Sequence, residues 1–213
     1  MMGCGVDEAG RGPVIGPLVI VGVCADREKL IQLGVKDSKK LSKRRREALE
    51  KEIKKIAERV VVKIIEPEEI DRLRREITLN EIEVMGFAEV INELNCMVVY
   101  VDAADVDAGR FARNIQKYLQ KEVKIISEHK ADEIYPEVSA ASIIAKVERD
   151  RRIEEIIREI GDFGSGYPSD PRTSKFLENY YKEHGEFPPH TRHSWKNARR
   201  IKAKAKQKSI EEF

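Results

Sequence analysis

Five short runs of apolar, β-branched residues, separated by helical patterns, limit the fold of this chain more than any other feature. Each run is bounded by turn residues, as is typical of β-strands, and the runs fall at 3–7, 18–24, 60–65, 97–102 and 123–127. Helical periodicity occupies 41–59, 68–77, 78–95, 109–119 and 136–160. Because a pair of strands comes first and later strands alternate with helices, this order predicts an α/β fold in which helices flank a mixed five-stranded sheet.

The sequence changes character after its longest helical pattern. Residues 138–145 are apolar or small on all sides, which predicts that the first half of this helix is buried. After Gly161 a turn-rich segment extends to Pro171, and helical stretches follow at 173–184 and 189–206. These features predict a small C-terminal helical subdomain attached to the sheet domain.

The net charge of +2 over 213 residues conceals a segregation of charge. Residues 36–46 hold seven basic residues and one acid, and residues 187–208 hold eight basic residues and no acid. The other 180 residues carry a net charge of −12. With 41% hydrophobic and 37% charged residues, neither a disordered chain nor a membrane protein fits. Two basic segments on an acidic body indicate a surface that binds a polyanion.

The sequence has three cysteines, Cys4, Cys24 and Cys96. They stand alone, with no C-x-x-C pair, and three cysteines are too few for a disulfide framework. We therefore expect each to be a small buried hydrophobic residue in a reducing compartment. No signal peptide precedes the first apolar run, and the run at 14–23 is too short to span a bilayer. The sequence predicts a soluble cytoplasmic protein.

Acidic residues follow three of the predicted strands. The first strand ends at Asp7 and Glu8, the fourth ends at Asp102, and an acidic cluster at 128–133 follows the fifth. Such groups could converge on one edge of the sheet. Carboxylates gathered without histidine or cysteine suit Mg²⁺ or Mn²⁺, which take oxygen ligands and share them with substrate phosphates.

Other ligand motifs fit less well. A calcium loop counted from Asp102 or Asp105 would place Arg113 or Gln116 where a bidentate glutamate is required. The glycines at 10–16 miss the dinucleotide motif by one position, and no phosphate-binding P-loop occurs. His190 and His193 have no acid or thiol near them in sequence, so a basic surface is favoured over a zinc site.

A turn with hydroxyl and ammonium groups precedes the first long helical pattern. Ser38, Lys39 and Lys40 are placed where lysine and a helix N-terminus can bind phosphate. The alternative is a solvated charged face, and we prefer that interpretation for Arg44 to Arg46.

Six motifs in one order resemble the type 2 ribonucleases H (ribonuclease HII), particularly the archaeal form. The resemblance covers nearly the whole chain. The motifs are GVDEAGRGP at 5–13 with IGP at 15–17, KDSKKL at 36–41, YVD at 100–102, HKAD at 129–132, VSAASIIAK at 138–146 and GSGYPSDP at 164–171.

The resemblance implies an RNase H-like fold with a catalytic domain at 1–160, a linker and helical substrate-binding subdomain at 161–206, and a tail at 207–213. It implies hydrolysis of RNA in RNA/DNA hybrids and cleavage 5′ to ribonucleotides embedded in duplex DNA. The products would carry 5′-phosphate and 3′-hydroxyl ends, and the setting would be ribonucleotide removal and primer processing in DNA replication and repair.

It also implies site residues. The four catalytic, metal-holding carboxylates would be Asp7, Glu8, Asp102 and Asp132. The ribonucleotide and its junction with DNA would be read by Gly10, Arg11, Gly12 and Tyr167, and Lys146 is placed with Ser38, Lys39 and Lys40 among the substrate contacts.

Phosphoryl-transfer chemistry with two bound divalent ions would activate water for in-line attack and stabilise the leaving 3′ oxygen. Asp7 and Asp102 are our choice for shared ligands, completed by Glu8 and Asp132. The Tyr167 ring would sense the 2′-hydroxyl that separates RNA from DNA. Its alternative role is an aromatic side chain that fills a groove between subdomains. The basic residues of 192–208 would contact phosphates without reading sequence.

The last residues suggest a partner. Gln207, Ile210 and Phe213 have the Q-x-x-I-x-x-F spacing of peptides that bind a sliding clamp (PCNA), with two apolar residues one helical turn apart. The alternative is a frayed tail. We expect a monomer.

Two other functions stay open on the sequence. One is a different nuclease with the RNase H fold, such as a resolvase or integrase. The other is a clamp adaptor without catalysis, for which the basic segments and tail suffice, although it leaves the acidic clusters unexplained.

Overall fold

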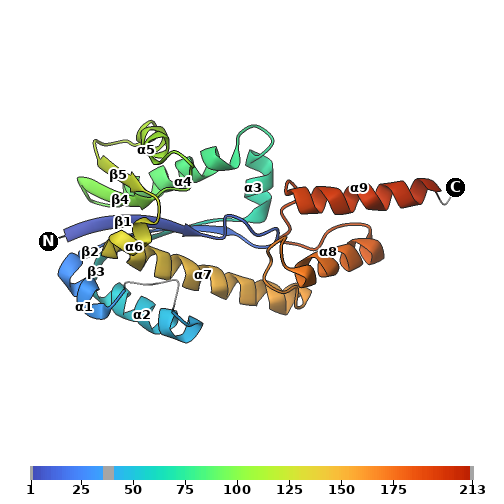
Figure 1. The fold of residues 1–213 in the computed structure, drawn as a ribbon, viewed down its shortest axis with the longest axis horizontal. Helices are drawn as coiled ribbons and strands as arrows, with labels where there is room; N and C mark the ends of the chain where they lie inside the picture. The colour runs from blue at the N-terminus through green and yellow to red at the C-terminus, as the bar shows by residue number, and fades with distance from the viewer. Residues whose placement is uncertain (1, 36–40, 212–213) are drawn as a thin grey trace. The chain divides into compact units, whose positions relative to one another are not determined.

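The protein contains a mixed five-stranded sheet, as the sequence predicts. The computed structural model describes residues 2–35 and 41–211. The strands are β1 (Met2–Ala9), β2 (Leu18–Asp26), β3 (Ala57–Ile65), β4 (Val98–Asp102) and β5 (Lys124–Glu128), in the order β3-β2-β1-β4-β5 (Figure 1). β1 pairs antiparallel with β2 and parallel with β4, and β4 pairs parallel with β5. The predicted α/β class is therefore confirmed.

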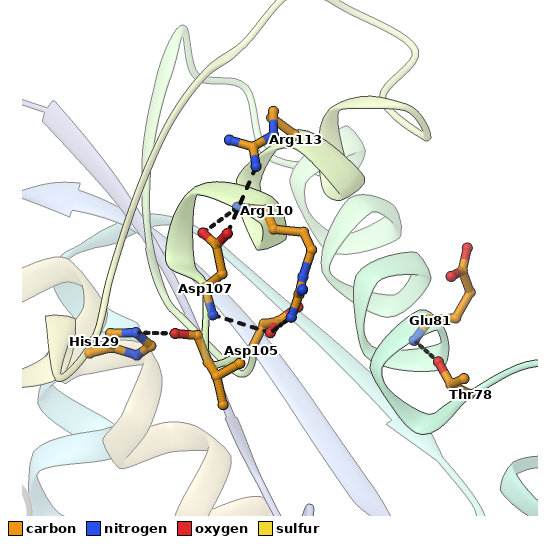
Figure 2. A network of polar contacts seen from close by, with 8 residues as sticks. Thr78, Glu81, Asp105, Asp107, Arg110, Arg113 and His129 are labelled. Atoms are coloured by element: carbon orange, nitrogen blue, oxygen red, sulfur yellow. Dashed lines mark hydrogen bonds and ion pairs between the residues drawn. The ribbon is translucent and has the colours of Figure 1, made fainter.

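Nine helices are present in the described chain. They are α1 (Arg27–Leu33), α2 (Lys43–Ile56), α3 (Pro67–Leu73), α4 (Leu79–Glu93), α5 (Ala108–Gln116), α6 (Ala131–Ile134), α7 (Pro136–Ile160), α8 (Pro171–His184) and α9 (Lys196–Glu211). The predicted start at 78 is confirmed, because the Thr78 hydroxyl accepts a hydrogen bond from the Glu81 N–H (Figure 2).

Three helical details differ from the prediction. The short helices α1 and α6 lack a long periodic pattern and were not predicted. Helix α9 begins at Lys196 rather than at residue 189. The preceding residues cannot be helical because they bond elsewhere: Thr191 forms a β-bridge with Ile15, and the N–H of His193 donates to Asp71.

The chain divides into two compact units, each built from separate segments. The first contains the sheet, helices α1, α2, α4, α5 and α6, and the part of α7 up to Arg149. The second contains 10–18, 65–77 and the chain from Asp150 onward. The functional boundaries placed at 160 and 206 stay a prediction.

The core of the first unit lies between β2, α2 and the first half of α7. Its fully buried members include Val21, Val23, Ile53, Ile143 and Ile144. The predicted burial of 138–145 is thus confirmed. Strand β1 and helix α7 are in backbone contact, since a Cβ on Gly5 would lie 2.3 Å from the Val138 nitrogen. This close approach brings α7 onto the face of the strand that also carries Asp7.

The second unit has its own apolar core. Residues from the 10–18 segment, α7, α8 and α9 meet in it: Val14, Ile15, Ile156, Phe163, Leu177, Phe187, Ala198 and Ile201. This core supports the loop that begins at Gly10.

The expectation that every cysteine stands alone was wrong. Cys4 and Cys24 form a disulfide, and only Cys96 is free. The two residues are opposite each other in the β1–β2 register, with Cα atoms 4.2 Å apart, within bridging distance. A separation of 20 residues in sequence does not reveal this register. Both are buried, as predicted.

Within the described residues, none of the helices combines the length and apolar character needed to cross a membrane.

Candidate active site

The parallel pairing of β1 and β4 brings two acids to one edge of the sheet. Val6 pairs with Val101 in the strand register, so Asp7 and Asp102 follow at the same level of neighbouring strands. Asp7 is 4% exposed, and Asp102 is partly buried. The negative charge of Asp102 is close enough to Asp7 to help raise the pKa of Asp7.

Asp102 also connects to the third acid. Its Oδ1 accepts a hydrogen bond of 2.9 Å from the N–H of Ala131, the first residue of α6. Asp132 is the next residue and is 3% exposed. An anion at a helix start is favoured by the unpaired N–H groups there. The loop after β5 is thereby held against the end of β4, and Asp132 follows the residue that is hydrogen-bonded to Asp102.

Glu8 is partly buried, and its backbone N–H donates to Oδ1 of Asp7 at 2.7 Å. This bond fixes the Asp7 carboxylate against its own backbone.

Helix α7 supplies the polar partners of Asp7. Burial, together with the negative charge of Asp102, raises the pKa of Asp7 from 3.8 to about 7. A hydrogen bond with Ser142 and the positive charge of Lys146 oppose this rise. Lys146 Nζ in turn donates to Ser142 Oγ at 2.8 Å. A buried carboxylate of this kind needs a nearby cation to remain charged.

The donor set fits a hard divalent cation. Its members are carboxylate oxygens, two of them on buried side chains, with no histidine or cysteine among the predicted residues. Within the described chain, these acids do not form a group of three whose ligand atoms all lie within 4.8 Å of one another. An open arrangement suits Mg²⁺, which binds one or two carboxylates and keeps waters and substrate oxygens in its remaining positions.

Two further acids after β4 have structural roles. Arg110 donates to both oxygens of buried Asp105, and these bonds lower the pKa of Asp105 to about 2 (Figure 2). Asp107 caps α5 by accepting the N–H of Arg110 at 2.9 Å. His129 faces the same loop, with Nε2 3.2 Å from the Val106 carbonyl oxygen. These contacts account for Asp105 and Asp107 without a metal.

In the second unit, the glycine-rich loop lies beside Tyr167. A Cβ on Gly12 would lie 3.3 Å from Cε1 of Tyr167, so the absence of a side chain at this position lets the ring approach the loop. Gly10 has a φ of 91°, which favours glycine. Tyr167 remains 38% exposed. The loop and the tyrosine, predicted together from separate motifs, are neighbours.

The Arg192 side chain forms hydrogen bonds with the backbone of this loop. Its guanidinium donates to the carbonyl oxygens of Gly10, Arg11 and Gly16 at 2.6, 2.9 and 2.9 Å. Trp195 Nε1 donates to the Gly12 carbonyl at 3.0 Å, and the Arg192 guanidinium lies 4.7 Å from the Trp195 ring centroid. Arg192 is 0% exposed, so the expectation that it contacts phosphate was wrong.

Several predicted residues cannot be placed. Ser38, Lys39 and Lys40 lie outside the described residues, as do Phe213 and the side chain of Ile210. Gln207 is exposed. Ser142 and Arg192 are the contributors that sequence reasoning missed. Ser142 is four residues before Lys146, on the same helix face, and this spacing is the signal that could have revealed it.

Comparison with known proteins decides the family. The ribonuclease HII family model matches residues 4–198. The chain belongs to the ribonuclease HII family. Ribonuclease HII of Pyrococcus furiosus is 52% identical over 98% of this chain and 96% of its own. The ribonuclease H2 of Pyrococcus horikoshii superposes with a TM-score of 0.91 at 49% identity, over 97% of this chain and 100% of that one.

A second solved relative is the ribonuclease HII in a PCNA:RNase HII complex from Archaeoglobus fulgidus. It has a TM-score of 0.86 and 47% identity, over 93% of this chain and 95% of that one. The protein is thus an endoribonuclease of the ribonuclease H type, a class that cleaves the RNA of RNA/DNA hybrids and depends on divalent metal ions. Ribonuclease HII membership rules out both the non-catalytic adaptor and the resolvase-like alternative.

Replacing Asp7 by Asn should stabilise the metal-free ribonuclease. An acid whose pKa is raised by folding loses its contribution to stability as pH increases through the folded value, here about 7. In EDTA at pH 8, the free energy of unfolding of Asp7→Asn should therefore exceed that of wild type by about 2–4 kcal/mol, so the variant should unfold at a higher temperature. At pH 4 the two proteins should unfold at the same temperature. Thermal melts at both pH values measure this, and a difference independent of pH would contradict it.

Proposed function

We propose that this ribonuclease HII is a Mg²⁺- or Mn²⁺-dependent endonuclease that also cleaves 5′ to single ribonucleotides in duplex DNA. Asp7, Glu8, Asp102 and Asp132 hold the metal, and the products carry 5′-phosphate and 3′-hydroxyl ends. The observation that carries the proposal is the buried Asp7 beside Asp102, with Asp132 joined to them through α6. The proposed setting is ribonucleotide removal and primer processing during DNA replication and repair.

The bound cation supplies charge that favours ionised water and stabilises a developing negative charge on phosphate oxygens. The side chains of this protein prepare its site. Lys146 and Ser142 favour the ionised form of Asp7, and the Ala131 N–H orients Asp102. Burial of Asp7 and Asp132 limits hydration of their carboxylates, so their charges act strongly on a cation.

The glycine-rich loop and Tyr167 read the ribonucleotide in this proposal. Gly10 to Gly12 follow directly after β1 in the chain, and the partly exposed Tyr167 ring beside Gly12 offers a flat surface for a sugar. The 2′-hydroxyl is the group that distinguishes RNA from DNA at such a surface. Lys146 and the residues Ser38, Lys39 and Lys40 are proposed contacts to substrate phosphate.

Tyr167→Ala should lower cleavage at a single embedded ribonucleotide by about 10–100-fold, since base and sugar contacts to an aromatic ring contribute about 1–3 kcal/mol. Tyr167→Phe keeps the ring and should retain most activity. Tyr118→Ala is the matched control, because Tyr118 is 40% exposed and bonds to Glu81 in the other unit. Initial rates on one ribonucleotide-containing duplex measure the effect, and equal rates for all variants would rule out the role of Tyr167.

Helix α9 supplies a basic surface for the duplex backbone. Ala198 and Ile201 are buried, while Lys196, Arg199, Arg200, Lys202 and Lys204 are exposed. Exposed cations on one helix contact phosphates without reading bases and make affinity fall with salt.

The C-terminal tail is proposed to bind a sliding clamp. The Archaeoglobus fulgidus relative forms a complex with PCNA, which supports this proposal. Deleting 207–213 should abolish binding to the clamp in surface plasmon resonance and leave cleavage of a short duplex unchanged. Phe213→Ala should act like the deletion and Lys208→Ala like wild type, since the apolar residues carry recognition in such peptides. Full clamp binding by the truncated chain would refute this assignment.

One assay tests the proposed reaction. The protein is incubated with Mg²⁺ and a DNA duplex that contains one ribonucleotide, and the ends of the products are identified. Cleavage 5′ to the ribonucleotide, with a 3′-hydroxyl and a 5′-phosphate, supports the proposal. Cleavage of long hybrids alone, with none at the single ribonucleotide, would overturn the proposed single-ribonucleotide activity.

A further inference from the structure

Three cysteine sulfurs converge in the first unit, away from the carboxylates. Cys4 in β1, Cys24 in β2 and Cys96 between α4 and β4 have Sγ atoms that all lie within 4.8 Å of one another. These three ligand-bearing side chains, all within the described part of the chain, are close enough together to enclose one metal ion. Three separate segments of chain therefore deliver soft ligands to one point.

The cysteines lie on the opposite face of the sheet from Asp7. In β1, Cys4 and Asp7 are an odd number of residues apart, so their side chains point to different faces. Gly5, on the Asp7 face, contacts α7, whereas Gly22, which pairs with Val6, packs against Val90 and Leu94 at the end of α4. The sulfur cluster is thus a separate site from the catalytic acids.

A cavity opens onto the cluster. Its volume is about 400 Å³, and all three cysteines line it together with Arg27, Glu58 and Met97. Cys4 and Cys24 are buried and Cys96 is partly buried. A small ion can reach the sulfurs through this space, and water within it can complete a coordination shell.

Reduction would let the three sulfurs take the spacing of a thiolate-bound metal. With Zn–S bonds of about 2.3 Å, two sulfurs in a tetrahedral shell are about 3.8 Å apart. Cys96 Sγ already lies within 4.8 Å of both other sulfurs, and breaking the Cys4–Cys24 bond frees those two side chains to rotate apart. The Cys4–Cys24 bond excludes metal, because both sulfurs are then joined to each other.

We propose that the reduced protein binds one soft metal ion, such as Zn²⁺, through Cys4, Cys24 and Cys96, and that the Cys4–Cys24 disulfide closes this site. A dithiol reductant gives two electrons and two protons to the disulfide and becomes a disulfide itself. Metal binding then releases the thiol protons to solvent, and water in the cavity takes the fourth position. The site is a redox-gated metal site, independent of the nuclease reaction.

The surroundings of Cys96 make binding dependent on pH. Burial raises the pKa of the Cys96 thiol, and the positive charge of Lys121 opposes the rise. Arg27 and Glu58 also face the cavity, and Arg27 is paired with Glu137. Because the thiols must lose protons to bind, affinity increases with pH.

The test uses the full chain in reduced and oxidised forms, with Cd²⁺ as a soft probe and excess Mg²⁺ to occupy the carboxylates. After reductant is removed without oxygen, native mass spectrometry and sulfur-to-cadmium charge-transfer absorption should show one Cd²⁺ per reduced chain. The oxidised chain should bind none. Zn²⁺ should compete with Cd²⁺ in the reduced chain.

Variants separate this site from others. Cys96→Ser keeps the disulfide and should weaken Cd²⁺ binding by the reduced chain by about 100-fold or more, since even the partners of metal ligands contribute 10–100-fold. Asp102→Asn should bind Cd²⁺ as wild type does. Binding that survives Cys96→Ser, disappears with Asp102→Asn, or persists in the oxidised chain would overturn the proposal. Thermal melts confirm that each variant is folded.

Discussion

Asp102→Asn should lower the rate of RNA cleavage at least about a thousandfold while the protein stays folded. Metal-assisted catalysis contributes several kcal/mol to such a reaction, and each 1.36 kcal/mol corresponds to tenfold in rate. The variant loses one negative charge at the point where β4 meets β1. The Asn oxygen can still accept the Ala131 N–H, so α6 should keep its position. Steady-state kinetics on a hybrid, at saturating Mg²⁺, measure the loss.

The control changes the same charge a few residues away. Asp107→Asn removes a carboxylate that caps α5, and Asn is an equally good cap. Its cleavage rate should stay within about twofold of wild type, because Asp107 bonds to the start of α5. Hybrid binding should persist in both variants. If Asp102→Asn kept more than a tenth of the wild-type rate, the assignment of Asp102 as a metal ligand would be wrong.

Arg192→Met should destabilise the second unit by about 3–5 kcal/mol. The guanidinium is buried and satisfies the carbonyl oxygens of Gly10, Arg11 and Gly16, which methionine would leave without their donors. Arg192→Lys keeps the charge but cannot span three carbonyls, so its loss should be intermediate. Urea unfolding followed by the fluorescence of Trp195, which lies beside Arg192, measures the change.

The matched variant is Arg199→Met, which removes an exposed charge from α9. It should change stability by no more than about 0.5 kcal/mol but reduce affinity for duplex at low salt. Arg192→Lys, which we expect to fold, should also raise the KM for a single-ribonucleotide substrate, since the loop beside Tyr167 is less well held. Equal stability of Arg192→Met and Arg199→Met would show that the three bonds contribute nothing.

The site was partly readable from the sequence because each acid follows a strand. Alternating β-branched runs locate β1, β4 and β5, and acids at the ends of parallel neighbours share one edge of the sheet. The pattern could not distinguish an acid that binds metal from an acid that has a structural role. Asp105 and Asp102 look alike in sequence, but Arg110 neutralises Asp105 while Asp102 is placed beside buried Asp7.

The sequence pattern likewise could not distinguish basic residues that are exposed from those that are buried. A run of lysines and arginines predicts phosphate contacts, which stay a prediction for the exposed residues of α9. Arg192 belongs to the same run, yet it is buried beneath a loop far from it in sequence. Local composition carries no information on which cation folds inward, because that depends on unsatisfied carbonyl oxygens elsewhere in the chain.

The sequence by itself determined the α/β class, the five strands, the buried half of α7 and the family, because hydrophobic periodicity and motif order are local properties. Only the tertiary structure decided the disulfide of Cys4 and Cys24, the burial of the Arg192 side chain and the interactions of Asp7 with Ser142 and Lys146 of α7. Each of these depends on strand register or on the packing of segments distant in sequence. Such contacts form only when the whole chain folds, so a short stretch of sequence does not contain the information that specifies them.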